Sequence, residues 1–272
     1  MVNKEKIIVA LDVPSAVQAR EIIAQLRNEV GAFKIGLQLF TSAGTAFVKE
    51  LVKARIKLFL DLKYHDIPNT VAKASVEAAR LGIWMFNVHT LGGSQMMLRA
   101  VDDVREVCDK ENLTQPKILG VTVLTSSDTN TLQEVGIKTN TTAQVSHLAH
   151  LASNCGLDGV VASPQEVKMI RGEIDNKRFL IVTPGIRPPM KSQNQIVSSI
   201  DDQSRIMSPT EAVYSGSDYL VIGRPILNAK NKILAVREIL EGINNVSAET
   251  QGESKVLEFT SENIKIDGSN RK

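Results

Sequence analysis

The chain of 272 residues is long enough for one large domain, and its hydrophobic fraction of 43% supplies a sizeable core. A formal net charge of +2 gives no indication of a polyanionic partner, and aromatic residues, at 4%, are too few to provide stacking surfaces for nucleic acid. The first apolar run, within residues 6–12, is too short for a signal peptide or a membrane span, so we expect a cytoplasmic protein.

Eight short apolar runs recur along the chain and predict eight β-strands. Their near-continuous Val, Ile and Leu content is typical of parallel strands that are buried on both faces. In chain order the predicted strands span residues 6–12, 32–36, 56–63, 84–89, 117–125, 158–163, 179–184 and 219–223.

Amphipathic stretches separate these runs and predict helices. Apolar residues recur at helical spacing in residues 94–110 and 228–243, and a similar face lies around residues 145–155. Serine and proline residues that are typical of helix starts precede several of the predicted helices. These pairs are Pro14-Ser15, Ser163-Pro164 and Ser208-Pro209.

Eight strand–helix alternations without a linker predict an α/β fold, a single-domain (β/α)8 TIM barrel in residues 1–244. An open, doubly wound sheet is the alternative fold for the same alternation. The polar stretch 188–208 predicts a loop over the top of the barrel. Residues 245–272 are polar and weakly patterned, which is typical of a disordered C-terminal tail.

Four charged residues are predicted to meet at the ends of the first three strands, where an α/β barrel places its active site. Asp61 and Lys63 are two apart on one strand and therefore share a face. With Asp12 and Lys34 they would form a self-neutralising cluster, since buried charges are found paired. A structural ion-pair network is the alternative interpretation. Asp66 follows the strand just before a proline turn and is a candidate for reaching a neighbouring subunit.

The loops after the last two predicted strands indicate a phosphate site. Gly185 and Gly223 offer backbone amides that an oxyanion can approach closely. Arg187 and Arg224 lie beside them, and a guanidinium group matches phosphate with paired donors. Because barrels commonly bind phosphate at these two loops, we predict a phosphorylated substrate.

The histidines and cysteines do not predict a metal centre. His65 and His89 each lie at a strand end, and we interpret them as hydrogen-bonded structural residues because neither has a second ligand at metal-binding spacing. Cys108 and Cys155 are far apart and lie within helical patterns, so we expect buried thiols in a reducing compartment.

The segment 61–70, with the sequence DLKYHDIPNT, closely resembles the signature of the orotidine 5′-phosphate decarboxylase family. Further matches to that family follow in the same order and cover about residues 6–243. They are residues 10–12, 33–36, 121–126, 183–187 and 221–225. The resemblance implies a carboxy-lyase that converts orotidine 5′-monophosphate to uridine 5′-monophosphate and CO2 without a cofactor, the last step of pyrimidine nucleotide synthesis.

The resemblance also implies catalytic roles for individual residues. Lys63 would donate a proton to C6 of the pyrimidine, and Asp61 would lie against the substrate carboxylate. Lys34 would join the charged chain and hold the ribose. Asp66 and Thr70 would enter the site of the other subunit, so the family pattern implies a homodimer with shared sites.

The remaining implied roles concern substrate binding. Asp12 would bind a ribose hydroxyl, Thr125 would contact the pyrimidine ring, and Pro184 would line its pocket. The phosphate would be held by Arg187, Gln203, Gly223 and Arg224.

Two other functions fit parts of this pattern. The magnesium-dependent hexulose-phosphate synthases and ketogulonate-phosphate decarboxylases share an Asp-x-Lys-x-x-Asp element, but they carry an acidic residue at the position of Lys34, where a lysine would repel a metal. A non-catalytic binder of phosphate ligands on a decayed barrel would have lost its charged cluster first, since unused buried charge is destabilising. The presence of all the charged residues therefore predicts an active enzyme.

Overall fold

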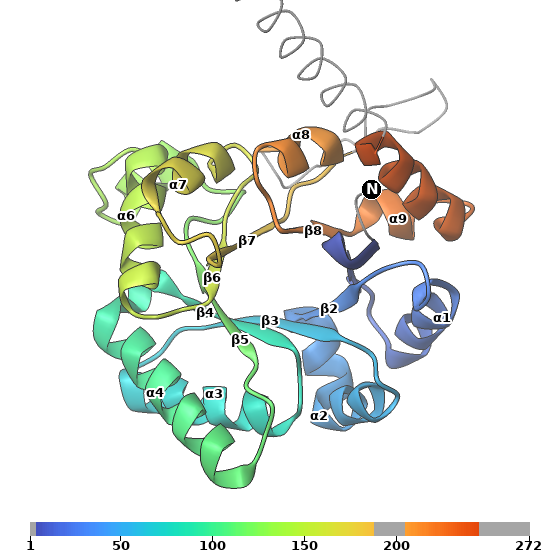
Figure 1. Ribbon diagram of the computed structural model, residues 1–272, viewed down its shortest axis with the longest axis horizontal. Helices are drawn as coiled ribbons and strands as arrows, with labels where there is room; N and C mark the ends of the chain where they lie inside the picture. The colour runs from blue at the N-terminus through green and yellow to red at the C-terminus, as the bar shows by residue number, and fades with distance from the viewer. Residues whose placement is uncertain (1–3, 188–204, 245–272) are drawn as a thin grey trace, which may run out of the picture.

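The computed structural model describes residues 4–187 and 205–244. Its eight strands are parallel and form a closed barrel in the order β1 to β8, with β8 pairing back onto β1 (Figure 1). The prediction of a (β/α)8 barrel is thus confirmed, and the open sheet is excluded. Gln203, most of the predicted loop 188–208 and the whole predicted tail 245–272 lie outside the described residues.

Every predicted strand is present, and most are shorter than predicted. The strands are β1 (Ile7–Ala10), β2 (Ala32–Gly36), β3 (Leu58–Tyr64), β4 (Met85–His89), β5 (Lys117–Val121), β6 (Gly159–Val161), β7 (Leu180–Thr183) and β8 (Tyr219–Ile222). The register places Ala10 opposite Lys34 and Gly36 opposite Asp61, so neighbouring strands end side by side. β6 approaches β7 so closely that a Cβ atom on Gly159 would lie 2.1 Å from the Leu180 carbonyl oxygen.

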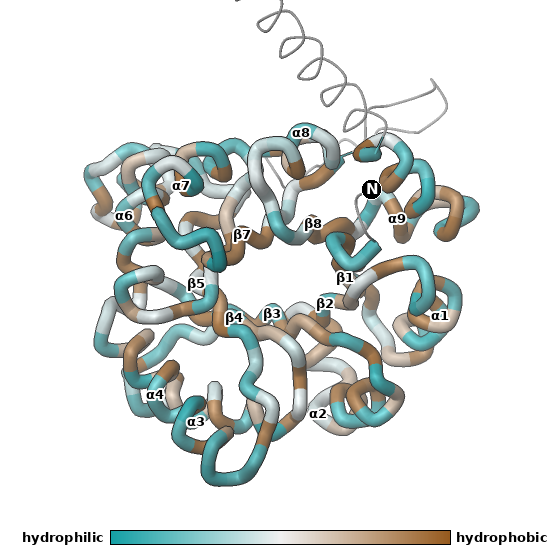
Figure 2. The backbone as a smooth tube through the Cα atoms, in the orientation of Figure 1, coloured by the Kyte–Doolittle hydropathy of each residue, from teal (hydrophilic) through white to brown (hydrophobic). Residues whose placement is uncertain are grey.

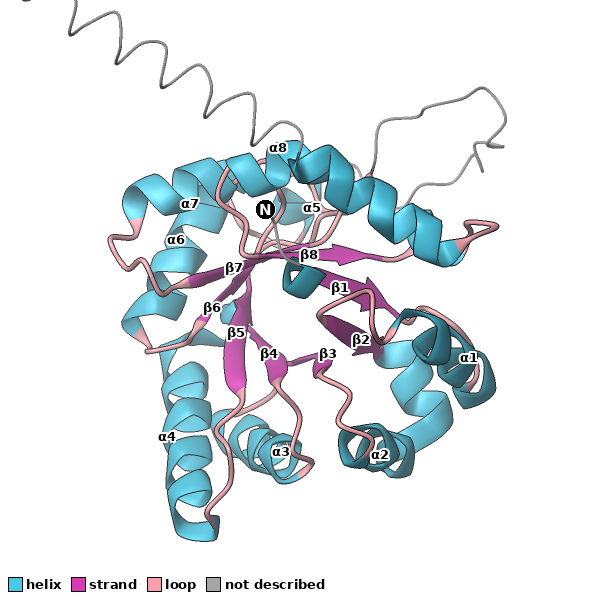
Figure 3. Cartoon of the chain, turned by 45° about the vertical axis from the view of Figure 1, so that its right-hand side comes forward, coloured by secondary structure: helices cyan, strands magenta, loops and turns pink. Residues whose placement is uncertain are grey.

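The helices surround the barrel as an outer layer (Figure 3). They are α1 (Ala16–Leu26), α2 (Leu37–Lys53), α3 (Pro68–Arg80), α4 (Gly93–Glu111), α5 (Thr129–Glu134), α6 (Thr141–Asn154), α7 (Val167–Glu173), α8 (Pro209–Tyr214) and α9 (Arg224–Leu227). Short 3-10 turns form η1 (Lys4–Lys6) and η2 (Thr90–Gly92), and a further helix occupies 232–244. None of the helices in residues 4–187 and 205–244 is long and apolar enough to cross a membrane.

Two of the three predicted helix starts are confirmed. Ser15 caps α1 by accepting a hydrogen bond from the Gln18 N–H, and Ser208 forms a capping box with Glu211 at the start of α8. The third prediction is wrong, because α7 begins at Val167 and not directly after Ser163. The Ser163 hydroxyl instead accepts from the Gln165 N–H within a turn that precedes the helix.

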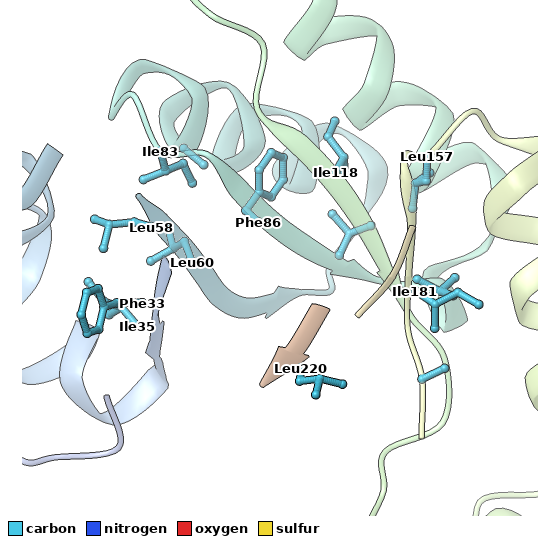
Figure 4. Packing of buried hydrophobic residues seen from close by; sticks show 14 of the residues in the cluster. Phe33, Ile35, Leu58, Leu60, Ile83, Phe86, Ile118, Leu157, Ile181 and Leu220 are labelled. Carbon is cyan, nitrogen blue, oxygen red and sulfur yellow. The ribbon is translucent and has the colours of Figure 1, made fainter. Parts of the chain in front are cut away.

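The strand residues divide into two apolar layers because alternate side chains point to opposite faces. One layer packs between the strands and the helices and includes Phe86 and Ile118 (Figure 4). The other fills the barrel interior and includes Ala32, Phe59 and Met85. Figure 2 shows the strands as mainly hydrophobic and the outer helices as mixed, with hydrophilic stretches on their surface.

The next inward-facing position of β2, β3 and β4 is polar. Two residues beyond the apolar interior layer these strands carry Lys34, Asp61 and Asn87, each of which is buried or partly buried. The apolar layer therefore forms the floor on which a charged layer rests at the carboxyl ends of the strands. This is the position at which an α/β barrel builds its active site.

Candidate active site

Four charged side chains form a continuous chain at the barrel mouth. Lys34 is 8% exposed, and its Nζ lies 3.3 Å from Asp12 Oδ1 and 3.2 Å from Asp61 Oδ2. The other oxygen of Asp61, Oδ1, lies 2.7 Å from Lys63 Nζ. The structure thus brings together the four residues that the strand ends predicted, with acidic and basic groups alternating.

The alternation keeps the buried groups ionised. Burial opposes ionisation of Asp61, but Lys34 and Lys63 outweigh it and lower the pKa of Asp61 to about 2. Burial also acts to lower the pKa of Lys34, and the carboxylates of Asp61 and Asp12 reverse this effect and raise it. Asp61 and Lys34 therefore both carry full charges at neutral pH. Each is paired with the other inside the barrel mouth and has little contact with solvent.

Lys63 reaches this chain from an irregular part of β3. Its φ of 52° lies in the left-handed region, and the pairing of β3 with β4 shifts register between Leu60 and Tyr64. The prediction that Asp61 and Lys63 point the same way rested on a regular strand. Their side chains do meet, but the backbone that brings them together is irregular between Leu60 and Tyr64.

Asn87, which connects Lys63 to Asp61, was not predicted from the sequence. Its side chain is fully buried; Oδ1 accepts a hydrogen bond from the Lys63 N–H, and Nδ2 donates one to Asp61 Oδ1, both at 2.8 Å. A signal was present, because Asn87 is the polar residue inside the apolar part of the run 84–89. A buried amide in such a run requires hydrogen-bond partners.

The two histidines at strand ends lie together. The rings of His65 and His89 stack with centroids 5.3 Å apart. Burial, then the neighbouring His65 and Lys63, lower the pKa of His89 to about 4. Its Nδ1 is buried, and no side chain or backbone group of the described residues forms a hydrogen bond with it. The described part of the chain contains no group of three metal-ligating side chains.

The loops after β7 and β8 lie at the same end of the barrel, and β8 pairs with β1, the strand that precedes Asp12. Gly185 has a φ of 78°, and the Arg187 N–H donates to the Met207 carbonyl, so residues on both sides of the segment 188–204 are paired. Gly223 precedes α9, whose first residue is Arg224. A Cβ atom on Gly223 would lie 3.2 Å from Asp12 Oδ2, which places the β8 loop directly beside the charged chain.

The remaining predicted site residues lie on other loops. Thr125 follows β5, and Pro184 directly follows β7. Asp66 is exposed, and its Oδ1 accepts a hydrogen bond from the Ile67 N–H at 2.6 Å. Thr70 is exposed in the first turn of α3. In the part of the chain that is described, no ion pair joins Asp66 to the charged chain of its own barrel.

A second buried ion pair was not predicted from the sequence. Arg205 contacts Glu166 and also donates to the Leu124 carbonyl at 2.7 Å. Burial raises the pKa of Glu166 to about 7, although the charge of Arg205 acts against this rise. These contacts join the segment after β7 to the loops that follow β5 and β6. Nothing in the spacing of the two residues indicates that they meet.

A family model described as orotidine 5′-phosphate decarboxylase / HUMPS family matches residues 5–239. The chain belongs to this family. Two relatives of the chain are orotidine 5′-phosphate decarboxylases. The one from Syntrophotalea carbinolica is 49% identical, and the match covers 88% of this chain and 94% of the relative. The one from Geotalea daltonii is 51% identical, and the match covers 88% of this chain and 96% of the relative. A crystal structure of orotidine 5′-phosphate decarboxylase from Lactobacillus acidophilus matches with a TM-score of 0.75 at 38% identity, covering 88% of this chain and 98% of that one.

The resemblance stated from the sequence is therefore confirmed. The match spans the whole barrel and includes every strand end that carries a charged residue of the site. The relatives cited above carry the decarboxylase name, and none of them carries the name of the hexulose-phosphate enzymes.

Proposed function

We propose that the chain decarboxylates orotidine 5′-monophosphate to uridine 5′-monophosphate and CO2 without a cofactor, as the last step of pyrimidine nucleotide synthesis. The observation that carries the proposal is the buried chain Lys34–Asp61–Lys63, with contacts of 3.2 and 2.7 Å. A barrel that holds such charges unused would be destabilised by them. We also propose a cytoplasmic location, where the free thiols of Cys108 and Cys155 would stay reduced.

The charged chain suits the chemistry of this decarboxylation. Loss of CO2 leaves the bonding electron pair on C6, where the ring cannot easily delocalise it. Fixed positive charge aimed at the developing anion in a site that excludes water is a large source of catalysis. The Lys63 ammonium would stabilise the anion and then transfer a proton to C6, after which solvent returns a proton to Lys63. Asp61 would lie against the departing carboxylate, and Lys34 would keep Asp61 ionised.

The other residues of the mouth would bind the substrate. Asp12, whose side chain is 56% exposed, would bind a ribose hydroxyl together with Lys34. Thr125 would contact the pyrimidine ring, and Pro184 would line its pocket. Phosphate would be held by Arg187, Gln203, Gly223 and Arg224. Binding energy from this remote group can be used to hold the pyrimidine against the charged chain.

We further propose a homodimer in which Asp66 and Thr70 complete the neighbouring site. Both residues are exposed, and large apolar side chains are exposed just after β2, β3 and β4. Ile67 after β3 is 66% exposed, and Leu37 after β2 is 60% exposed. Leu91 after β4 is 43% exposed. Exposed apolar surface beside a polar site is typical of a protein interface.

The magnesium-dependent alternative is disfavoured by the position of Lys34. Its ammonium lies within 3.3 Å of both Asp12 and Asp61 and so occupies the space between the two carboxylates. A divalent cation bound there would meet a positive charge that is itself buried.

The proposal is tested by following the absorbance of orotidine 5′-monophosphate in the presence of protein that has been treated with EDTA. We expect rapid loss of the orotate chromophore and equimolar formation of uridine 5′-monophosphate. Absence of turnover, together with activity on hexulose or ketogulonate phosphates that depends on added magnesium, would replace the proposal with the alternative.

A further inference from the structure

Asn87 occupies a position in β4 that only its hydrogen bonds explain. The strand alternates, so Met85, Asn87 and His89 face the barrel interior while their neighbours pack against helices. The Asn87 side chain is fully buried, and an unpaired buried amide costs roughly 1–3 kcal/mol. Both ends of this amide are satisfied, by the Lys63 N–H and by Asp61 Oδ1.

The two bonds fix the orientation of the amide. The carbonyl oxygen faces a backbone donor, and the NH2 group faces a carboxylate acceptor. Rotating the amide by 180° would place two donors together at Lys63 and two acceptors together at Asp61. Asn87 is therefore an oriented connector between the residue proposed to donate the proton and the carboxylate beside it.

The backbone of Lys63 requires such a connector. A lysine with a φ of 52° is in a conformation that costs roughly 1–2 kcal/mol and persists only where its surroundings enforce it. The shift of register between Leu60 and Tyr64 also takes the Lys63 N–H out of the ladder between β3 and β4, so it needs another acceptor. Asn87 Oδ1 supplies that acceptor.

We propose that Asn87 is a positioning residue that sets the location of the Lys63 ammonium by holding the Lys63 backbone in its left-handed conformation and anchoring Asp61. This inference rests on the proposed function. Asn87 acts through these two residues, to which both of its hydrogen bonds are made. Because misplacement of a reacting group by about 1 Å costs on the order of 100-fold in rate, loss of the connector should act on turnover and not on binding.

The test compares Asn87→Leu, which is similar in size and removes both bonds, with Thr122→Val as a control. Thr122 is also fully buried, lies after β5 and donates one hydrogen bond to the Val161 carbonyl at 3.0 Å. We expect Asn87→Leu to lower kcat by roughly 100-fold while KM and the Kd for uridine 5′-monophosphate stay within about threefold. The control should keep all three constants within about threefold.

Hydrogen exchange at the Lys63 amide provides a readout that does not depend on catalysis. We expect Asn87→Leu to accelerate this exchange by roughly tenfold or more relative to wild type, and Thr122→Val to leave it unchanged. If the leucine variant does not fold, Asn87→Ala replaces it with the same expectation for the Lys63 amide.

Two results would overturn the inference. One is a kcat of Asn87→Leu close to that of wild type, and the other is unchanged exchange at Lys63. A loss of nucleotide affinity as large as the loss of kcat would also count against it, because it would indicate general damage to the site. Failure of the wild-type protein to decarboxylate the substrate would instead refute the proposed function, and the exchange measurement would still test the connector.

Discussion

Replacing Asp61 with Asn removes the charge that the two lysines share while keeping the shape of the side chain. At an effective dielectric constant of about 20, the attractions of Asp61 to Lys34 at 3.2 Å and to Lys63 at 2.7 Å are about 5 and about 6 kcal/mol. Burial offsets most of this gain. The pKa of Asp61, lowered from 3.8 to about 2, corresponds to a net stabilisation of its charged form of about 2 kcal/mol.

The variant loses this stabilisation and also leaves the buried Lys34 facing an amide. Breaking a buried ion pair by removing one partner typically costs about 3–5 kcal/mol, and Asp12 still balances part of the Lys34 charge. We therefore expect Asp61→Asn to lower the free energy of unfolding at pH 7 by about 3 kcal/mol, which lowers Tm by roughly 5 °C in a protein of this size.

The difference in stability should shrink as the pH rises. In the wild type the pKa of Lys34 is raised above its ordinary value of 10.5. The contribution of Lys34 to stability is therefore complete below pH 10.5 and is lost as the pH rises through the raised pKa. In the Asp61→Asn variant, we expect burial to lower the pKa of Lys34 in the folded state. The unfolded state then binds the Lys34 proton more tightly than the folded state does. The free energy of unfolding of the variant therefore rises as the pH approaches about 10.

Urea unfolding at pH 7 and pH 10, at one protein concentration, measures both effects. Asp103→Asn is the matched control, because Asp103 pairs with Arg99 on the surface of α4 and its loss should cost less than about 1 kcal/mol. Equal stability of wild type and Asp61→Asn at pH 7, or a difference that is the same at both pH values, would refute the electrostatic reasoning.

The remaining predictions concern the phosphate, the dimer and the histidine pair. Arg224→Ala should raise KM roughly thirtyfold, or about 2 kcal/mol, with little change in kcat, and an unchanged KM would contradict the phosphate assignment. Mixing inactive Lys63→Ala and Asp66→Asn proteins should restore activity in assays after subunit exchange, whereas no recovery despite demonstrated exchange would place Asp66 outside the neighbouring site. The pKa of His89 is 6.5 in its ordinary state and about 4 in the folded protein. As the pH falls, His89 is therefore protonated in the unfolded state before it is protonated in the folded state. Urea unfolding should therefore show wild type losing about 2 kcal/mol more stability than His89→Gln between pH 7 and pH 5, and parallel losses would show that His89 is not buried as a neutral ring.

The barrel and the charged chain could be predicted from the sequence because both depend on patterns within individual strands. Continuous apolar runs identify strands buried on both faces, and the charged residues on the first three strands identify Asp12, Lys34, Asp61 and Lys63 as one cluster at the barrel mouth. The start of α7 was predicted wrongly because a serine–proline pair also begins a turn, as it does at Ser163.

Contacts between strands could not be predicted in the same way. The hydrogen bond from the Lys63 N–H to Asn87 depends on the irregular backbone of β3, and no residue type at that point marks a left-handed backbone. The stacking of His65 on His89 depends on the register between β3 and β4, which single-strand periodicity does not give. The pairing of Arg205 with Glu166 depends on how loops fold over the barrel, which apolar periodicity does not describe.

The most direct test of the central claim is the turnover of orotidine 5′-monophosphate by wild type and by Lys63→Ala, with the affinity of each for uridine 5′-monophosphate measured alongside. The account predicts rapid decarboxylation by wild type, none detectable by the variant, and nucleotide binding by both. Substantial turnover by pure Lys63→Ala protein would contradict the role of Lys63 as the proton donor at the end of the charged chain.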